Sequence, residues 1–237
     1  MKKILLALFV LALIPSTSNA QMWLTLKGGG GLATVGGYTG SVGGLAAGGG
    51  LGYKHQISKR VMIEGDILLD TRAVLYPNGL VDTDGKILYY TGGGTYIQVP
   101  ITVQYMIPFK KKELIPYRMG QPKSYWFLEG GPYISYGTGV LPYFDPTIIA
   151  LWAANDDPIS EDNLKPRKID FGITAGLGIN FSIRDGKNRL IVGGRTNYGM
   201  LSIYKDKKLG KATNLSMVGY LALDFSLTKR KHIRHRW

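Results

Sequence analysis

A long alternation of apolar and other residues constrains this chain more than any other feature. From Ile169 to Ile183 every odd position is apolar and every even position is small or polar, and the segment Leu215–Leu227 repeats the pattern with Gly219 as its one odd-numbered exception. A period of two places successive side chains on opposite faces of a β-strand. These strands exceed the roughly 5–6 residues usual in soluble sheets and suit the roughly 9–11 that cross a membrane, with additional rim residues.

The same pattern predicts six further strands, which brings the total to eight. They lie near Met22–Ala33, Gly44–Lys54, Arg60–Asp70, Thr95–Met106, Ser124–Gly137 and Arg189–Ser202. An even number of antiparallel strands closes a barrel with both ends on one side. The 33 glycines and 15 tyrosines also favour many strands and turns over helices. We therefore predict an all-β protein, an eight-stranded antiparallel up-and-down transmembrane β-barrel.

The connections between these segments alternate in length. The turns Gln56–Lys59 and Arg184–Asn188 are short, whereas Thr71–Gly94 and Thr138–Lys168 are long loops. Short periplasmic turns and long external loops are typical of the outer membrane. The basic stretch Pro108–Lys123 is the exception, because it is a long connection on the periplasmic side, where the other connections are short. Pro100 cannot donate to a ladder and predicts a bulge or kink.

The N-terminal residues predict export and divide the chain. Lys2 and Lys3 precede the apolar stretch Ile4–Ile14, and Ala20 offers a cleavage site, as in a secretory signal peptide preceding the barrel. The stretch is shorter than the roughly 20 residues of a spanning helix, which disfavours the alternative of an uncleaved anchor. The expected parts are a signal peptide (1–20), an outer-membrane β-barrel (21–227) and a basic periplasmic tail (228–237). The absence of cysteine argues against a disulfide-stapled secreted module.

Parity within the strands separates lipid-facing residues from residues of the lumen. It predicts an aromatic girdle at the lipid interface near the periplasmic rim. The girdle consists of Tyr53, Tyr105, Trp126, Phe181 and Phe225. Parity also predicts a lumen ion network of Lys27, Arg60, Glu64, Asp66, Glu129, Asp170, Arg195 and Asp224. Eight strands leave just enough room for side chains, so these charges are expected to pair and plug the barrel. A path for protons or small ions is the alternative, and a soluble lipocalin-like barrel would point its apolar face inward.

Enzyme, metal and nucleotide chemistry find no support in the residue patterns. Acyl chemistry on lipid A would require a serine and histidine near the outer leaflet, but His55 falls at the periplasmic end of its strand and His232 and His235 in the tail. The glycine runs lack the lysine and helix of a phosphate loop. The acidic cluster Asp156, Asp157, Glu161 and Asp162 is interpreted as a solvated loop face, with calcium as the alternative. We expect no enzyme, no cofactor and no metal.

Charge and loop composition predict contacts at the membrane surface. The formal charge is +13, and basic residues gather in Lys110–Lys112, Lys205–Lys211 and Lys229–Arg236. Beside anionic lipid such patches contact phosphates, so Lys205, Lys207, Lys208 and Lys211 are candidate lipopolysaccharide contacts. The periplasmic patches would meet an envelope protein or the inner leaflet, and the compartment excludes nucleic acid. The loop Asp145–Ala154 is expected to form a short helix that covers the barrel mouth or binds a partner or lipid.

Several segments together resemble the PorT-like family of small outer-membrane β-barrels. They are Tyr96–Ile101, Glu129–Tyr133, Gly172–Gly178 and Gly219–Leu221. The resemblance covers the mature chain and implies the barrel fold and the cell outer membrane, and it allows a role as an accessory component of a type IX secretion or gliding system. Phe225 departs from the pattern, because a basic tail follows it where many such barrels end on an aromatic residue. A structural or interaction role is favoured, with a small-solute pore and a lipid A-modifying enzyme as disfavoured alternatives.

Overall fold

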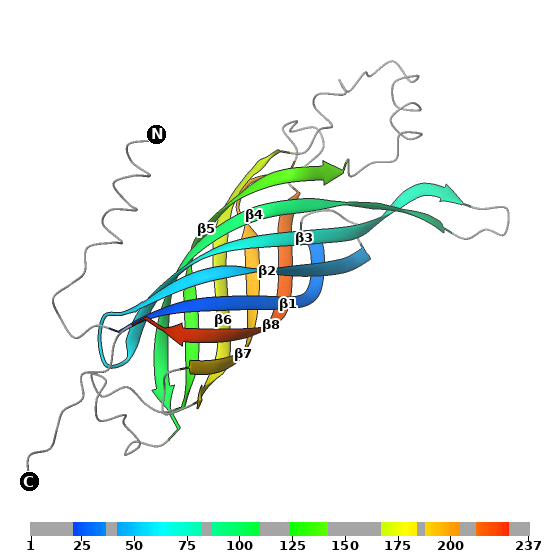
Figure 1. Cartoon of the computed structure of the whole chain (residues 1–237). Coiled ribbons are helices and arrows are strands. Elements are labelled where there is room, and N and C mark those ends of the chain that lie inside the picture. Colours follow the sequence, from blue (N-terminus) through cyan, green and yellow to red (C-terminus); the bar gives the residue numbers. More distant parts are fainter. Residues whose placement is uncertain are drawn as a thin grey trace, which may run out of the picture.

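The fold is a closed β-barrel, which confirms the predicted architecture (Figure 1). A computed structural model describes residues 21–36, 42–81, 87–109, 124–141, 167–183, 188–203 and 212–227. Eight antiparallel strands follow one another around the barrel, and β8 pairs with β1 to close it. They are β1 (Met22–Gly36), β2 (Val42–Gln56), β3 (Val61–Val81), β4 (Ile87–Pro108), β5 (Tyr125–Leu141), β6 (Ile169–Ile183), β7 (Asn188–Gly199) and β8 (Thr213–Ser226).

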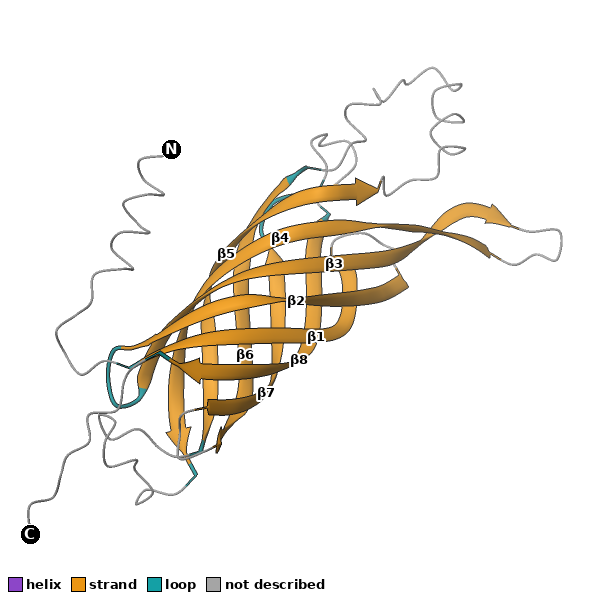
Figure 2. Ribbon diagram, viewed as in Figure 1, coloured by secondary structure: helices purple, strands orange, loops and turns teal. Residues whose placement is uncertain are grey.

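The register shows how steeply the strands run around the barrel. Pairs followed from Met22 on β1 through every strand return to β1 at Leu32, a stagger of 32 − 22 = 10 residues. For eight strands this corresponds to a tilt of about 35–45°. The described part of the chain contains strands and short connections (Figure 2). It includes no helix that is long and apolar enough to cross a membrane.

All charged side chains of the eight strands are buried in the barrel interior. The five cations are Lys27, Lys54, Arg72, Arg189 and Arg195, and the six carboxylates are Glu64, Asp66, Asp70, Glu129, Asp170 and Asp224. Along β6 the exposed positions are odd and apolar, whereas Asp170, Thr174 and Asn180 are buried. The alternation therefore places the polar face inside and the apolar face outside.

Large apolar side chains are exposed on the outside of all eight strands. The most exposed aliphatic side chains include Leu32, Leu45, Leu51, Ile67, Ile101, Leu128, Ile134, Ile173, Leu177, Met217 and Leu221, which come from seven of the eight strands. Such a surface is stable only against hydrocarbon, and a closed barrel leaves no backbone edge in the lipid. The protein is therefore an integral β-barrel of the cell outer membrane, and the soluble alternative is excluded.

The two ends of the barrel differ. β1 begins and β8 ends at the end that also carries the short connection between β2 and β3, which in barrels of this class is periplasmic. At the other end β3 and β4 continue together far past their neighbours (Figure 1), and Val81 still pairs with Ile87. The prediction of a loop over Thr71–Gly94 is therefore wrong, since most of this segment is a paired extension of the two strands.

One further sequence prediction is contradicted by the structure, and four others concern residues outside the described part of the chain. The register is unchanged across Pro100, and the irregularity between β4 and β5 lies at Thr95 and Tyr96, so a bulge at Pro100 is excluded. The signal peptide, the Asp145–Ala154 helix, the acidic loop cluster and the basic tail all lie outside the described residues.

Candidate functional site

The lumen is the candidate functional site, and its periplasmic end is filled by large apolar side chains. Trp23, Met62, Met106 and Tyr125 are fully buried there, with Phe127 beside them in the same cluster. Arg189 crosses this layer, with its guanidinium carbon 4.6 Å from the Trp23 ring centroid and 5.4 Å from that of Tyr125. Its Nη1 also donates to the Tyr125 hydroxyl at 3.0 Å. Cation–π contacts and a hydrogen bond thus hold the buried charge in an aromatic layer.

An ion cluster fills the middle of the lumen. Lys27 Nζ lies 2.9 Å from Glu64 Oε1 and 2.8 Å from Asp66 Oδ2. Arg195 donates from Nε to Glu129 Oε1 at 2.8 Å and from Nη1 to Asp66 Oδ2 at 3.1 Å. The five side chains come from β1, β3, β5 and β7, so their hydrogen bonds cross the barrel from wall to wall.

Polar neighbours extend this central cluster. Gln104 Nε2 donates to Glu64 Oε2 at 2.5 Å and to Glu129 Oε2 at 2.8 Å, which links the two carboxylates. Lys54 Nζ lies 3.4 Å from Glu64 Oε1 and 3.1 Å from Asp224 Oδ1, so the cluster continues toward the periplasmic end. Buried ions are tolerated when they are paired with an opposite charge and their remaining donors and acceptors make hydrogen bonds. The central cluster meets both conditions over most of its atoms.

A second polar layer lies toward the extracellular end. Arg72 Nη2 lies 2.6 Å from Asp70 Oδ2 and 3.2 Å from Gln98 Oε1. Asp170 Oδ2 accepts from the Tyr133 hydroxyl at 3.2 Å and from Asn214 Nδ2 at 3.1 Å. The lumen is therefore layered into an aromatic periplasmic layer, a central ion cluster and an outer polar layer.

Inward glycines make room for these large side chains. On β5 the inward residues Phe127, Glu129 and Tyr133 pair in register with Gly178, Gly176 and Gly172 of β6. A Cβ at Gly178 would lie 2.6 Å from Cζ of Phe127, and one at Gly172 would lie 2.6 Å from Cε1 of Tyr133. Small residues on one strand therefore complement large ones on the next, and this complementarity explains why the interior can be filled without widening the barrel.

Substitutions at two neighbouring glycines of β7 would test this packing. A Cβ at Gly193 would lie 2.6 Å from the Tyr220 ring, whereas nothing lies within 4 Å of one at Gly194. We expect Gly193→Val to lower the free energy of unfolding by about 1–3 kcal/mol through overpacking. Gly194→Val, which points outward from the same strand, is the matched control and should change it little. Urea titration of the barrel in liposomes measures both, and equal losses would contradict the packing.

The structure brings together most of the predicted lumen residues and displaces one. Lys27, Glu64, Asp66, Glu129, Asp170, Arg195 and Asp224 all lie in the interior. Arg60 does not, so its assignment to the lumen is wrong: it is exposed in the connection before β3, and its Nη1 donates to the Tyr105 hydroxyl at 3.3 Å. β3 begins at Val61, one residue after the position to which parity was extended.

Sequence analysis overlooked four charged residues of the lumen. Lys54, Asp70, Arg72 and Arg189 are all buried. Each has the inward parity of its strand, so the alternation itself contained the signal. They were passed over because they stand at or beyond the predicted strand ends, where charges usually belong to turns.

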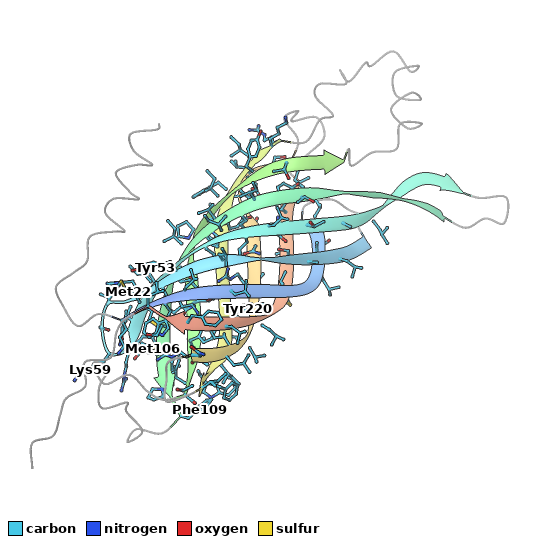
Figure 3. The ribbon with its side chains drawn as sticks, viewed as in Figure 1. Met22, Tyr53, Lys59, Met106, Phe109 and Tyr220 are labelled. Carbon is cyan, nitrogen blue, oxygen red and sulfur yellow. The ribbon has the colours of Figure 1, made fainter. Side chains whose placement is uncertain are left out.

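The predicted aromatic girdle points outward at the periplasmic end. Tyr105, Trp126, Phe181 and Phe225 are exposed and Tyr53 is half-buried. Phe109 joins them, with its ring centroid 5.6 Å from that of Trp126 and 6.4 Å from that of Phe181. Figure 3 shows Tyr53, Lys59 and Phe109 near one end of the barrel and Tyr220 farther along it. Aromatic side chains at this level suit the boundary between lipid and water.

The residues Lys205, Lys207, Lys208 and Lys211 lie outside the described residues. Among the described residues, no group of three or more His, Asp or Glu side chains is placed to hold a metal ion. The chemistry that the lumen offers is ion pairing and hydrogen bonding between buried side chains.

Comparisons with known proteins find no related sequence and only distant likenesses among solved structures. No protein-family model matches the chain, and no curated protein sequence is similar to it. Among solved structures, it is similar to Neisserial surface protein A (11% identity, 88% of this chain and 98% of that chain, TM-score 0.43). It is also similar to OprG of Pseudomonas aeruginosa (9%, 88% and 97%, TM-score 0.47) and to the N-terminal β-barrel domain of OprF of the same organism (11%, 88% and 98%, TM-score 0.40). The assignment as a membrane barrel rests on the strand pairing and on the apolar exterior of this chain, not on these distant likenesses.

Proposed function

We propose that this protein is a closed outer-membrane barrel with a structural or interaction role, which docks partners or lipopolysaccharide through its loops and basic patches. The filled lumen is the observation that carries the proposal. Two polar layers and an aromatic layer occupy the interior, and Trp23, Met62, Met106 and Tyr125 close its periplasmic end. A barrel of this width has no room for both these side chains and a solute path. Its contacts with other molecules therefore belong to its outer surface.

The closed lumen predicts that the protein does not conduct ions. Purified, folded protein inserted into a planar bilayer is expected to give no stable conductance steps, because the central charges are paired with one another and large buried side chains fill the periplasmic end of the lumen. Heat-modified gel mobility of the same sample verifies that the barrel is folded. Uniform steps whose size scales with salt concentration would overturn the closed-lumen proposal and revive the pore.

The docking role requires the β3–β4 hairpin to face the outside of the cell. Because the chain contains no cysteine, single cysteines report the orientation cleanly. Gly79→Cys in the extended part of β3 should react with a membrane-impermeant maleimide on intact cells. Ser58→Cys, in the exposed connection before β3 at the periplasmic end, should react only after the outer membrane is permeabilised. The reverse pattern would place the docking surfaces on the periplasmic side.

The basic loop residues Lys205, Lys207, Lys208 and Lys211 are the proposed lipopolysaccharide contacts. Their clustering in the sequence between β7 and β8 supports this role, since β7 ends and β8 begins at the extracellular end. Replacing all four by glutamine should weaken retention of lipopolysaccharide by the purified barrel. Glutamine at Lys59, Lys229 and Lys231, outside that connection, is the control. Affinity purification of the intact protein from membranes, followed by mass spectrometry, would identify an envelope partner.

We further propose that the chain belongs to the PorT-like barrels. The motifs that carry the resemblance supply the complementary interior surfaces of β5 and β6, where Glu129 and Tyr133 pair with Gly176 and Gly172. An accessory role in type IX secretion or gliding is the sharper form of this proposal. Loss of secretion or gliding on deletion of the gene, restored by the intact protein, would support it, and an unchanged phenotype would leave the general docking role alone.

A further inference from the structure

The exposed acidic and basic side chains of the described residues carry only positive charge. Every carboxylate among those residues lies in the lumen, whereas Lys59 and Arg60 are exposed at the periplasmic end and Arg167 and Lys168 at the extracellular end. At a membrane surface, such cations attract the phosphate groups of lipids. The described rims of the barrel are therefore complementary in charge to lipid phosphates.

The side chain of Arg60 is turned to the outside of the barrel. Arg60 stands one residue before β3, and the alternation of that strand would direct its side chain into the lumen, yet the residue is exposed. Its Nη1 donates to the Tyr105 hydroxyl at 3.3 Å. Tyr105 lies on the outer face of β4 and is 44% exposed. The guanidinium is therefore held against the lipid-facing wall and not in the mouth of the barrel.

The turn before β3 fixes the backbone of this cation. The amides of Ile57 and Ser58 donate to the Val61 carbonyl at 3.0 Å and 3.2 Å, and the amide of Arg60 donates to Ser58 Oγ at 3.3 Å. Lys59 belongs to the same turn, and Figure 3 shows it at this end of the barrel. The turn therefore presents two neighbouring cations at the periplasmic rim.

The wall beside Arg60 has room for an acyl chain. Tyr105 belongs to the aromatic girdle, and aromatic residues of this kind lie at the boundary between hydrocarbon and water. Farther along β3, Gly65 lies in register with Tyr53 of β2 and Ile101 of β4, and a Cβ at Gly65 would meet nothing within 4 Å. A glycine within a strand often marks a place where a ligand approaches the backbone closely. A lipid whose headgroup lies at Arg60 can therefore lay its acyl chain against Gly65.

We propose that Arg60, oriented by Tyr105 and assisted by Lys59, binds the phosphate of a phospholipid in the inner leaflet of the outer membrane. The planar guanidinium offers paired N–H donors that match two phosphate oxygens, and the bond to the Tyr105 hydroxyl sets its orientation. Phospholipids form the leaflet at this end of the barrel, whereas lipopolysaccharide occupies the opposite leaflet. The site is therefore separate from the lipopolysaccharide contacts proposed above.

Photo-crosslinking locates the lipid on the folded protein. The barrel in maltoside micelles, which contain no phosphate, is mixed with phosphatidylglycerol that carries a diazirine next to its headgroup, and mass spectrometry measures labelling of the segment Ser58–Gly65. Arg60→Met should reduce this labelling about fivefold, the contribution of one cation at an anionic membrane surface. Tyr105→Phe removes the hydroxyl and no charge, so it should also reduce the labelling if the guanidinium must be oriented. Arg167→Met, an exposed cation at the opposite end, is the matched control and should leave the labelling unchanged.

Several results would overturn the lipid site. Equal labelling of Arg60→Met and the unaltered protein would exclude Arg60, and equal losses in Arg60→Met and Arg167→Met would reflect general charge attraction. Suppression by inorganic phosphate at the concentration of the probe would assign the site to a free anion. Heat-modified gel mobility verifies that each variant is folded, and if Arg60→Met does not fold, Tyr105→Phe decides. Loss of lipopolysaccharide docking would leave these results unaffected, since that docking uses the other end of the barrel.

Discussion

Replacement of Arg195 by methionine is expected to lower the free energy of unfolding by about 3–5 kcal/mol. Arg195 lies 2.8 Å from Glu129 and 3.1 Å from Asp66, and all three side chains are buried. Its loss removes the cation that neutralises Glu129, and among the described residues the donors that remain on this buried carboxylate are the neutral Gln104 and Tyr220. Breaking a buried pair from one side has this magnitude. Urea titration of the barrel in liposomes measures the loss.

Two further variants separate pairing from packing. Arg60→Met removes an exposed guanidinium and should cost less than about 1 kcal/mol, as exposed charges generally do. The double variant Arg195→Met with Glu129→Gln should recover part of the stability, because the stranded carboxylate is gone. If the double variant is as unstable as the sum of its two single variants, the two side chains are not coupled and the proposed network is wrong at its centre.

Replacement of Leu177 by arginine is expected to cost about 2–4 kcal/mol and to lower the fraction of protein that inserts into liposomes. Leu177 is 57% exposed near the middle of β6, with its side chain on the apolar exterior. A charge at this depth on the lipid face of a barrel has that cost. Heat-modified gel mobility after insertion measures the folded fraction.

The matched control at the same position is Leu177→Phe. Lipid accommodates the larger ring, so this variant should insert as the unaltered protein does. In a soluble barrel the side chain would meet packed neighbours instead, and the phenylalanine would cost about 1–3 kcal/mol by overpacking. Equal damage from both substitutions would therefore speak against a lipid-facing surface.

The number of strands and their faces could be predicted from the sequence because parity is a local property. Ile169–Ile183 is strand β6 to the residue, and the inward positions of Glu64, Asp66 and Asp170 follow from alternation alone. Strand ends could not be placed equally well. Past Asp70 the two strands extend beyond the lipid-facing part of the barrel, where strands need not alternate apolar and polar residues. Hydropathy therefore does not distinguish a strand from a loop there, and the pairing of β3 with β4 up to Val81 and Ile87 was not predicted.

The composition of the lumen was partly predictable, but its contacts were not. Lys27 meets Glu64 and Asp66 two strands away because the stagger of the barrel brings them to one level. That stagger depends on the register of every strand pair, which no single segment encodes. The pairing of Phe127, Glu129 and Tyr133 with three glycines of β6 is also a property of register.

Lipid accessibility along β6 tests the central claim most directly, namely that the apolar face meets hydrocarbon and the polar face meets a filled interior. Single nitroxide labels at Ile173, Ala175, Leu177 and Ile179, and at the inward residues Thr174 and Ser182, are compared in liposomes by their collision rates with oxygen and with a water-soluble nickel complex. The structure predicts high oxygen and low nickel accessibility at the four odd positions, and low values for both reagents at Thr174 and Ser182. Nickel accessibility at the odd positions, or oxygen accessibility that peaks at the even ones, would contradict it.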